Sequence, residues 1–122
     1  MKKHKFSCER GGLTIRGNLF QPEGENLPIA ILSHGFMANQ STMKGYAQAA
    51  AELGFAAFTY DFCGGCLWGR SDGKTTDMSV LTEVEDLKAV IAYASSLPFT
   101  DESRIVLIGA SQGGFVSALT AA

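Results

Sequence analysis

The stretch Gly109-Ala110-Ser111-Gln112-Gly113 decides the fold of this chain. It lies between an apolar run at residues 104–108 and a segment of small residues at 115–122 with helical character. This setting predicts a tight strand–turn–helix element, whose two glycines let the strand and helix backbones approach closely. We expect the Ser111 hydroxyl to project above the sheet, beside the free N–H groups at the start of the helix.

The segments before this turn alternate between short apolar runs and helical patterns. Weak alternation at 3–8 and 12–20, around Arg10-Gly11-Gly12, predicts an antiparallel hairpin. The other predicted elements are strand 28–32, helix 43–53, strand 55–60, a Gly-rich loop at 61–77, helix 79–96 capped by Ser79, and strand 104–108. This order predicts an α/β fold with a mostly parallel sheet and helices on both faces.

Length and composition restrict the class of protein. The 122 residues are 46% hydrophobic and 18% charged, which indicates one folded domain and not a disordered chain. The net charge of −2 includes no basic block, so we expect neither nucleic acid nor a membrane as partner. Neither a membrane span nor the apolar core of a signal peptide is evident, and three cysteines suggest no disulfide framework. We therefore expect a cytoplasmic protein.

Three motifs together resemble the front half of an α/β-hydrolase. They are His34-Gly35-Phe36 after a buried strand, Asp61-Phe62 with a loop ending in Ser71-Asp72-Gly73, and the Gly-x-Ser-x-Gly turn. Within that superfamily the chain is most similar to the cinnamoyl and feruloyl esterases and their bacterial relatives. The resemblance covers the whole chain, so we expect residues 1–122 to be the N-terminal part of a single hydrolase domain that stops after the turn's helix.

The resemblance implies a serine esterase that acts on a small-molecule ester without a cofactor or a metal. Ser111 would be the nucleophile that forms an acyl-enzyme, and the backbone N–H groups of Phe36 and Gln112 would form the oxyanion hole. The glycines that would allow the backbone turns around this site are Gly35, Gly109 and Gly113.

The acid and the histidine of the expected catalytic triad do not follow Ser111. In this fold the triad order is Ser, then Asp or Glu, then His, whereas residues 112–122 contain neither an acid nor a histidine. His34 would shape the oxyanion loop and would not be the base. We therefore expect the chain as given to be inactive alone. The alternatives are a non-catalytic binding or assembly module, or a peptidase, lipase or thioesterase of the same fold.

Several other residues allow a functional or a structural interpretation. The spacing of Cys63 and Cys66 is that of a redox pair, but a loop with two incidental thiols fits better, since no second pair completes a zinc site. Trp68, together with Phe36, either lines an acyl pocket or simply packs. Asp61 is expected to hold its loop through backbone N–H groups.

Two surface features are also expected. The acidic residues of helix 79–96 are interpreted as its solvent-exposed face; they are Glu83, Glu85 and Asp86. In the family's sheet, strand 104–109 is bordered by a strand encoded after Ala122. Without that neighbour its edge is exposed, and we expect dimerisation or other self-association there.

Overall fold

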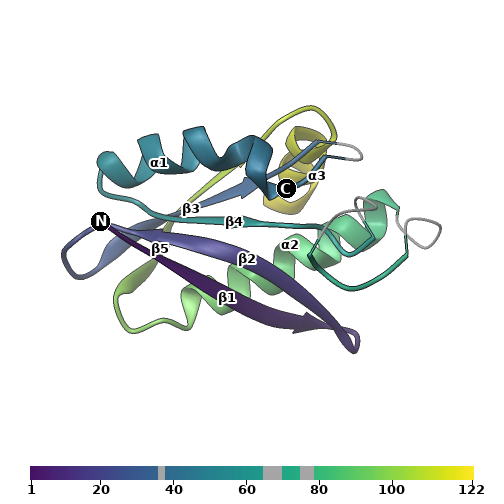
Figure 1. Cartoon of the computed structure of the whole chain (residues 1–122), viewed down its shortest axis with the longest axis horizontal. Coiled ribbons are helices and arrows are strands. Elements are labelled where there is room, and N and C mark those ends of the chain that lie inside the picture. The colour runs from purple at the N-terminus through teal and green to yellow at the C-terminus, as the bar shows by residue number, and fades with distance from the viewer. Residues whose placement is uncertain (36–37, 65–69, 75–78) are drawn as a thin grey trace.

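The computed structural model describes residues 1–35, 38–64, 70–74 and 79–122 (Figure 1). In chain order the elements are β1 (Lys2–Arg10), β2 (Leu13–Gln21), β3 (Leu27–Ser33), the 3₁₀ helix η1 (Gln40–Met43), α1 (Lys44–Glu52), β4 (Ala56–Tyr60), α2 (Val80–Ser95), β5 (Thr100–Gly109) and α3 (Gln112–Ala121). Every strand and helix expected from the sequence is present.

The strands form one mixed sheet with the order β1-β2-β4-β3-β5. β2 runs antiparallel to both β1 and β4, whereas β3 runs parallel to both β4 and β5. An N-terminal hairpin is thus joined to three parallel strands, which confirms the predicted fold class. The carboxyl ends of β3, β4 and β5 lie at the same edge of the sheet, where the three sequence motifs begin.

Helices cover both faces of the sheet, with α1 on one side and α2 on the other (Figure 1). Alternate side chains of β3 point to opposite faces, so Ile29 and Ile31 pack in the cluster that includes α2 and α3. Ala30 and Leu32 pack against the alanines of α1. β3 is therefore buried on both faces, as its continuous apolar run predicted.

β5 begins earlier than the sequence indicated. Its first residues, Thr100 and Asp101, pair with Leu27 and Pro28, and the register then shifts so that Ile29 pairs with Ile105. The polar residues 102–104 form this irregularity. Because they are not apolar, the apolar run that predicted the strand begins only after them.

β5 is an edge strand within the described part of the chain, where it pairs with β3 alone. On β5 the apolar side chain of Val106 is 44% exposed, and on the following helix α3 Phe115 is 56% and Leu119 45% exposed. An exposed edge strand with apolar neighbours is a template for pairing with a second chain.

We expect the substitution Val106→Lys to weaken self-association of this chain, because a lysine on an edge strand opposes pairing with another strand. Sedimentation velocity over a concentration series measures the effect. Tyr46→Lys is the control, since Tyr46 is 64% exposed but lies on α1. Equal self-association of Val106→Lys and the unmodified chain would contradict the expectation.

Candidate active site

Ser111 occupies a tight turn between β5 and α3. Its backbone has φ 55° and ψ −118°, a conformation that side-chain-bearing residues rarely adopt. The turn is closed by the Gly113 N–H, which donates to the Ala110 carbonyl at 2.9 Å, and by the Phe115 N–H, which donates to the Ser111 carbonyl at 3.2 Å. Ser111 is exposed. The strained turn predicted from the sequence is present, and its serine is accessible.

Two glycines make this turn sterically feasible. A Cβ atom on Gly113 would overlap the carbonyl oxygens of Ser33 and His34 at the end of β3. A Cβ atom on Gly109 would overlap the backbone of Gly113. Both positions therefore require glycine because of close backbone approach.

The loop after β3 begins directly beside Ser111. The Ala110 N–H donates to the Ser33 carbonyl at 3.2 Å and joins the ends of β5 and β3. A Cβ atom on Gly35 would lie 3.5 Å from the Cβ of Ser111. Phe36, the expected oxyanion donor, comes next in the chain and lies outside the described residues.

Gln112, the other expected oxyanion donor, is the first residue of α3. Among the described residues, its backbone N–H has no hydrogen-bond acceptor. Its side-chain Nε2 donates to Oε1 of Glu83 at 2.5 Å. The backbone N–H at the positive end of α3 is thus available to an anionic oxygen next to Ser111.

His34 is buried, and both of its ring nitrogens contact backbone groups. Nε2 accepts a hydrogen bond from the Phe62 N–H at 3.1 Å, and Nδ1 donates to the Gly35 carbonyl at 2.7 Å. Burial lowers the pKa of His34, which favours the neutral ring that this pattern requires. The contacts agree with the expected loop-shaping role and leave neither nitrogen for Ser111.

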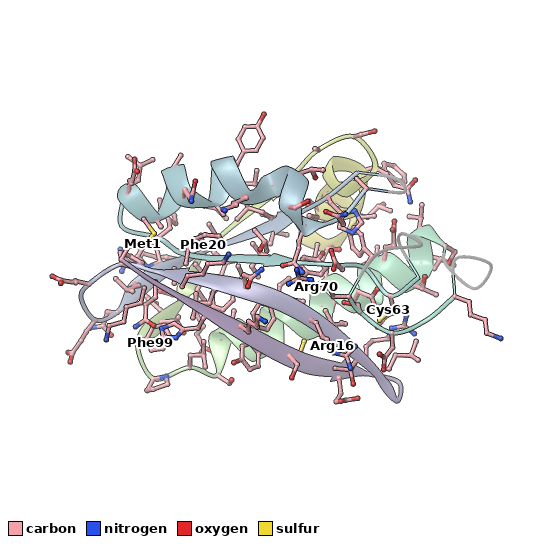
Figure 2. The ribbon with its side chains drawn as sticks, viewed as in Figure 1. Met1, Arg16, Phe20, Cys63, Arg70 and Phe99 are labelled. Carbon is pink, nitrogen blue, oxygen red and sulfur yellow. The ribbon has the colours of Figure 1, made fainter. Side chains whose placement is uncertain are left out.

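Asp61 holds the loop after β4, as expected. Its Oδ1 accepts the Gln40 N–H at 2.7 Å, and its Oδ2 accepts the Arg70 N–H at 2.7 Å and the Gln40 side-chain Nε2 at 3.1 Å. Arg16 of β2 donates to the Arg70 carbonyl at 2.8 Å, and both labelled residues appear to the right of Phe99 in Figure 2. The loop is therefore anchored to η1 and to the hairpin.

The prediction that the acidic residues of α2 face solvent is wrong for two of the three. Glu85 is exposed, but Glu83 is only 1% exposed and Asp86 is fully buried. Asp86 accepts hydrogen bonds from Nε of Arg10 at 2.7 Å and from the N–H of Cys63 at 2.8 Å. The two buried acids thus bind groups that lie far from them in the sequence.

A signal for this burial was present in the sequence. Glu83 and Asp86 share one helical face with the buried residues Leu87 and Val90, at spacings of three, four and seven residues from Glu83. Glu85 falls on the opposite face. Helical periodicity therefore separates the three acids, whereas their charge alone does not.

The surroundings of the two buried carboxyl groups shift their pKa values. Burial raises the pKa of Glu83, the nearby charge of Asp86 acts in the same direction, and the hydrogen bond from Gln112 opposes them. Burial also raises the pKa of Asp86, while the hydrogen bond from Arg10 opposes it. Glu83 differs from Asp86 in having an amide, not a guanidinium, as its partner.

Cys8 and Cys63, the two thiols in the described part of the chain, show no feature of a redox site or of a metal site. Burial raises the pKa of Cys63 to about 12 and that of Cys8 to about 11, so both stay protonated at neutral pH. Cys66 and Trp68 lie outside the described residues, so the C-x-x-C pair and the acyl pocket stay predictions. In the described part of the chain no three His, Cys, Asp or Glu side chains are arranged to bind a metal ion. Nor does that part contain a helix long and apolar enough to span a membrane.

Comparison with known proteins gives consistent matches. The family model described as serine aminopeptidase, S33, matches residues 24–122. An uncharacterized 31.7 kDa protein from the traX-finO intergenic region of Escherichia coli is 37% identical over 113 residues, which cover 91% of this chain and 37% of that protein.

Solved structures match over nearly the whole chain. The complex of DcsB with its substrate analogue has a TM-score of 0.89 and 32% identity, covering 98% of this chain and 41% of that chain. Est1E from Butyrivibrio proteoclasticus with ferulic acid bound has a TM-score of 0.86 and 28% identity, covering 95% and 46%. The chain thus spans less than half the length of these relatives.

We expect Gly113→Ala to lower the free energy of unfolding by about 1–3 kcal/mol, because its methyl group would push α3 away from the end of β3. Urea unfolding measures the loss. Gly45→Ala is the control, because a Cβ there meets no atom within 4 Å and an alanine within α1 should raise stability by about 0.5–1 kcal/mol. A Gly113→Ala protein as stable as the parent would contradict the close approach.

We also expect the free energy of unfolding to fall as pH rises from the ordinary carboxyl range through the raised pKa of Glu83. Over that window the folded protein binds a proton more tightly than the unfolded chain does, so deprotonation favours unfolding. Glu83→Gln should remove part of the decline, and Glu85→Gln should keep it. Urea unfolding between about pH 4 and pH 8 tests this, and identical slopes for all three proteins would refute it.

Proposed function

Because the chain belongs to the serine aminopeptidase S33 family of α/β-hydrolases, we propose that it carries the nucleophile and the oxyanion hole of a serine ester hydrolase. The observation that carries this proposal is the exposed Ser111 in a strained turn at the N-terminus of α3. A hydroxyl held there is adjacent to backbone N–H groups, the arrangement that acyl transfer requires.

The proposed reaction proceeds through an acyl-enzyme. Oγ of Ser111 attacks the ester carbonyl carbon, and the resulting oxyanion accepts hydrogen bonds from the backbone N–H groups of Gln112 and Phe36. Collapse of this intermediate releases the alcohol and leaves the acyl group on Ser111. A water molecule then adds to the acyl carbonyl, and a second collapse releases the carboxylic acid.

The proton transfers need a histidine oriented by an acid. His34 is committed to loop contacts, and residues 112–122 contain no candidate. We assign both roles to residues outside 1–122. The lengths of DcsB and Est1E, of which this chain covers 41% and 46%, support this division of the site.

Small aryl or alkyl esters are the proposed substrates. The ferulic acid bound to Est1E supports an aryl acyl group, since that structure matches 95% of this chain. Peptide hydrolysis is a second candidate, favoured by the description of the matched family. Both reactions use the same nucleophile and differ in the leaving group, so the substrate distinguishes them. Among the described residues Cys8 and Cys63 are free thiols, which supports the proposal of a cytoplasmic location.

We expect Ser111→Ala to abolish hydrolysis of p-nitrophenyl acetate by the native protein, with a loss of about 10⁶ in kcat. The fold should survive because Ser111 is exposed, and circular dichroism checks this. Ser7→Ala, at an exposed position on β1, is the control. A Ser111→Ala protein with a tenth of the original turnover would exclude Ser111 as the nucleophile. A native protein without esterase or peptidase activity would favour the non-catalytic module.

A further inference from the structure

Glu83 is a buried carboxyl group beside the residue that follows Ser111. It lies near the start of α2, where the Glu83 N–H donates to the Ser79 carbonyl at 3.0 Å. The side chains and backbone N–H groups of Ser79 and Thr82 exchange two hydrogen bonds that cap this turn. The position of Glu83 is therefore set by a well-capped helix, and not by a loop.

The Glu83 carboxyl accepts a hydrogen bond from Gln112 but takes part in none of the ion pairs of the described residues, whereas Asp86 pairs with Arg10. Removing a carboxyl group from water is costly, and an apolar side chain would fill the space between α2 and α3 without that cost. A carboxylate between α2 and α3 is explained by its contact with Gln112, because the Gln112 side-chain amide needs a hydrogen-bond acceptor at that position.

This contact ties the turn to α2 in addition to its contact with β3. Gly113 rests against the carbonyl groups at the end of β3, and the Gln112 side chain is tied to α2 through Glu83. The backbone of Ser111 has a strained conformation, and strained backbone persists only where its surroundings hold it. Without the Glu83 contact, that peptide could rotate and turn its N–H away from the site.

We propose that Glu83 is a positioning residue for the oxyanion hole: through the Gln112 side chain it orients the Gln112 backbone N–H toward the developing oxyanion. The inference rests on the proposed ester hydrolysis at Ser111. Glu83 itself contacts neither substrate nor nucleophile and transfers no proton. Its role is to accept a hydrogen bond, which a glutamine can also do.

The first test is the steady-state kinetics of the native protein with p-nitrophenyl acetate. Glu83→Ala should lower kcat about 10- to 100-fold with little change in KM, less than the loss of about 10²–10³ from deleting an oxyanion donor. Glu83→Gln should recover most of the lost kcat, because its amide oxygen accepts from Gln112. Glu85→Ala is the matched control on the exposed face of α2.

The second test locates the effect in the contact between Glu83 and Gln112. Methionine has a similar volume to glutamine but cannot donate a hydrogen bond to Glu83. Gln112→Met should therefore lower kcat as much as Glu83→Ala does, and it provides the test if Glu83→Ala folds poorly. The double variant should be no slower than either single variant, because both substitutions remove the same bond. Losses that multiply in the double variant would overturn the proposal.

The third test does not depend on catalysis. The backbone amide resonance of residue 112 in ¹H–¹⁵N spectra should shift in Glu83→Ala and stay near its original position in Glu83→Gln. An unshifted resonance in Glu83→Ala overturns the positioning role whatever the activity. If Ser111→Ala abolishes turnover while Glu83→Ala keeps the original kcat, the inference fails and ester hydrolysis stands. If Ser111→Ala leaves turnover unchanged, the proposed function fails, and the inference about its oxyanion hole fails with it.

Discussion

The close approach of Gly113 to the end of β3 is the constraint on which the site depends. The backbone of α3 can rest against the carbonyl groups of Ser33 and His34 only because residue 113 lacks a Cβ atom. That proximity forces a short connection between β5 and α3, and the connection places Ser111 in a strained, exposed conformation. The free energy that holds this strain comes from the packing of α3 on the sheet.

The loops at the carboxyl ends of the parallel strands support one another. His34, after β3, accepts the N–H of Phe62 in the loop after β4. Asp61, after β4, accepts the N–H of Gln40 in the segment after β3. Each loop is thus held by a side chain from the other loop. The backbone N–H groups beyond the strand ends, which have no partner in the sheet, therefore find buried side-chain acceptors. These contacts fix the positions of the loops after β3 and β4, and none of them involves Ser111.

α2 connects this edge of the sheet to the hairpin through its two buried acids. Asp86 holds Arg10 and the backbone of Cys63, while Glu83 holds Gln112 beside the nucleophile. One helix face therefore sets both the loop after β4 and the start of α3. Because buried carboxyl groups require matched partners, these contacts also fix the position of α2 along the sheet.

The sequence by itself determined the order of strands and helices, the cap at Ser79 and the turn around Ser111. These features depend on local spacing of apolar residues and glycines, which neighbouring residues specify. Only the tertiary structure decided which groups the buried Glu83 and Asp86 bind and that β5 begins at Thr100. Asp86 meets Arg10 across 76 positions of sequence, Glu83 meets Gln112 across 29, and Thr100 pairs with Leu27. Such partners are brought together by packing, because no local pattern encodes a distance between residues remote in the chain.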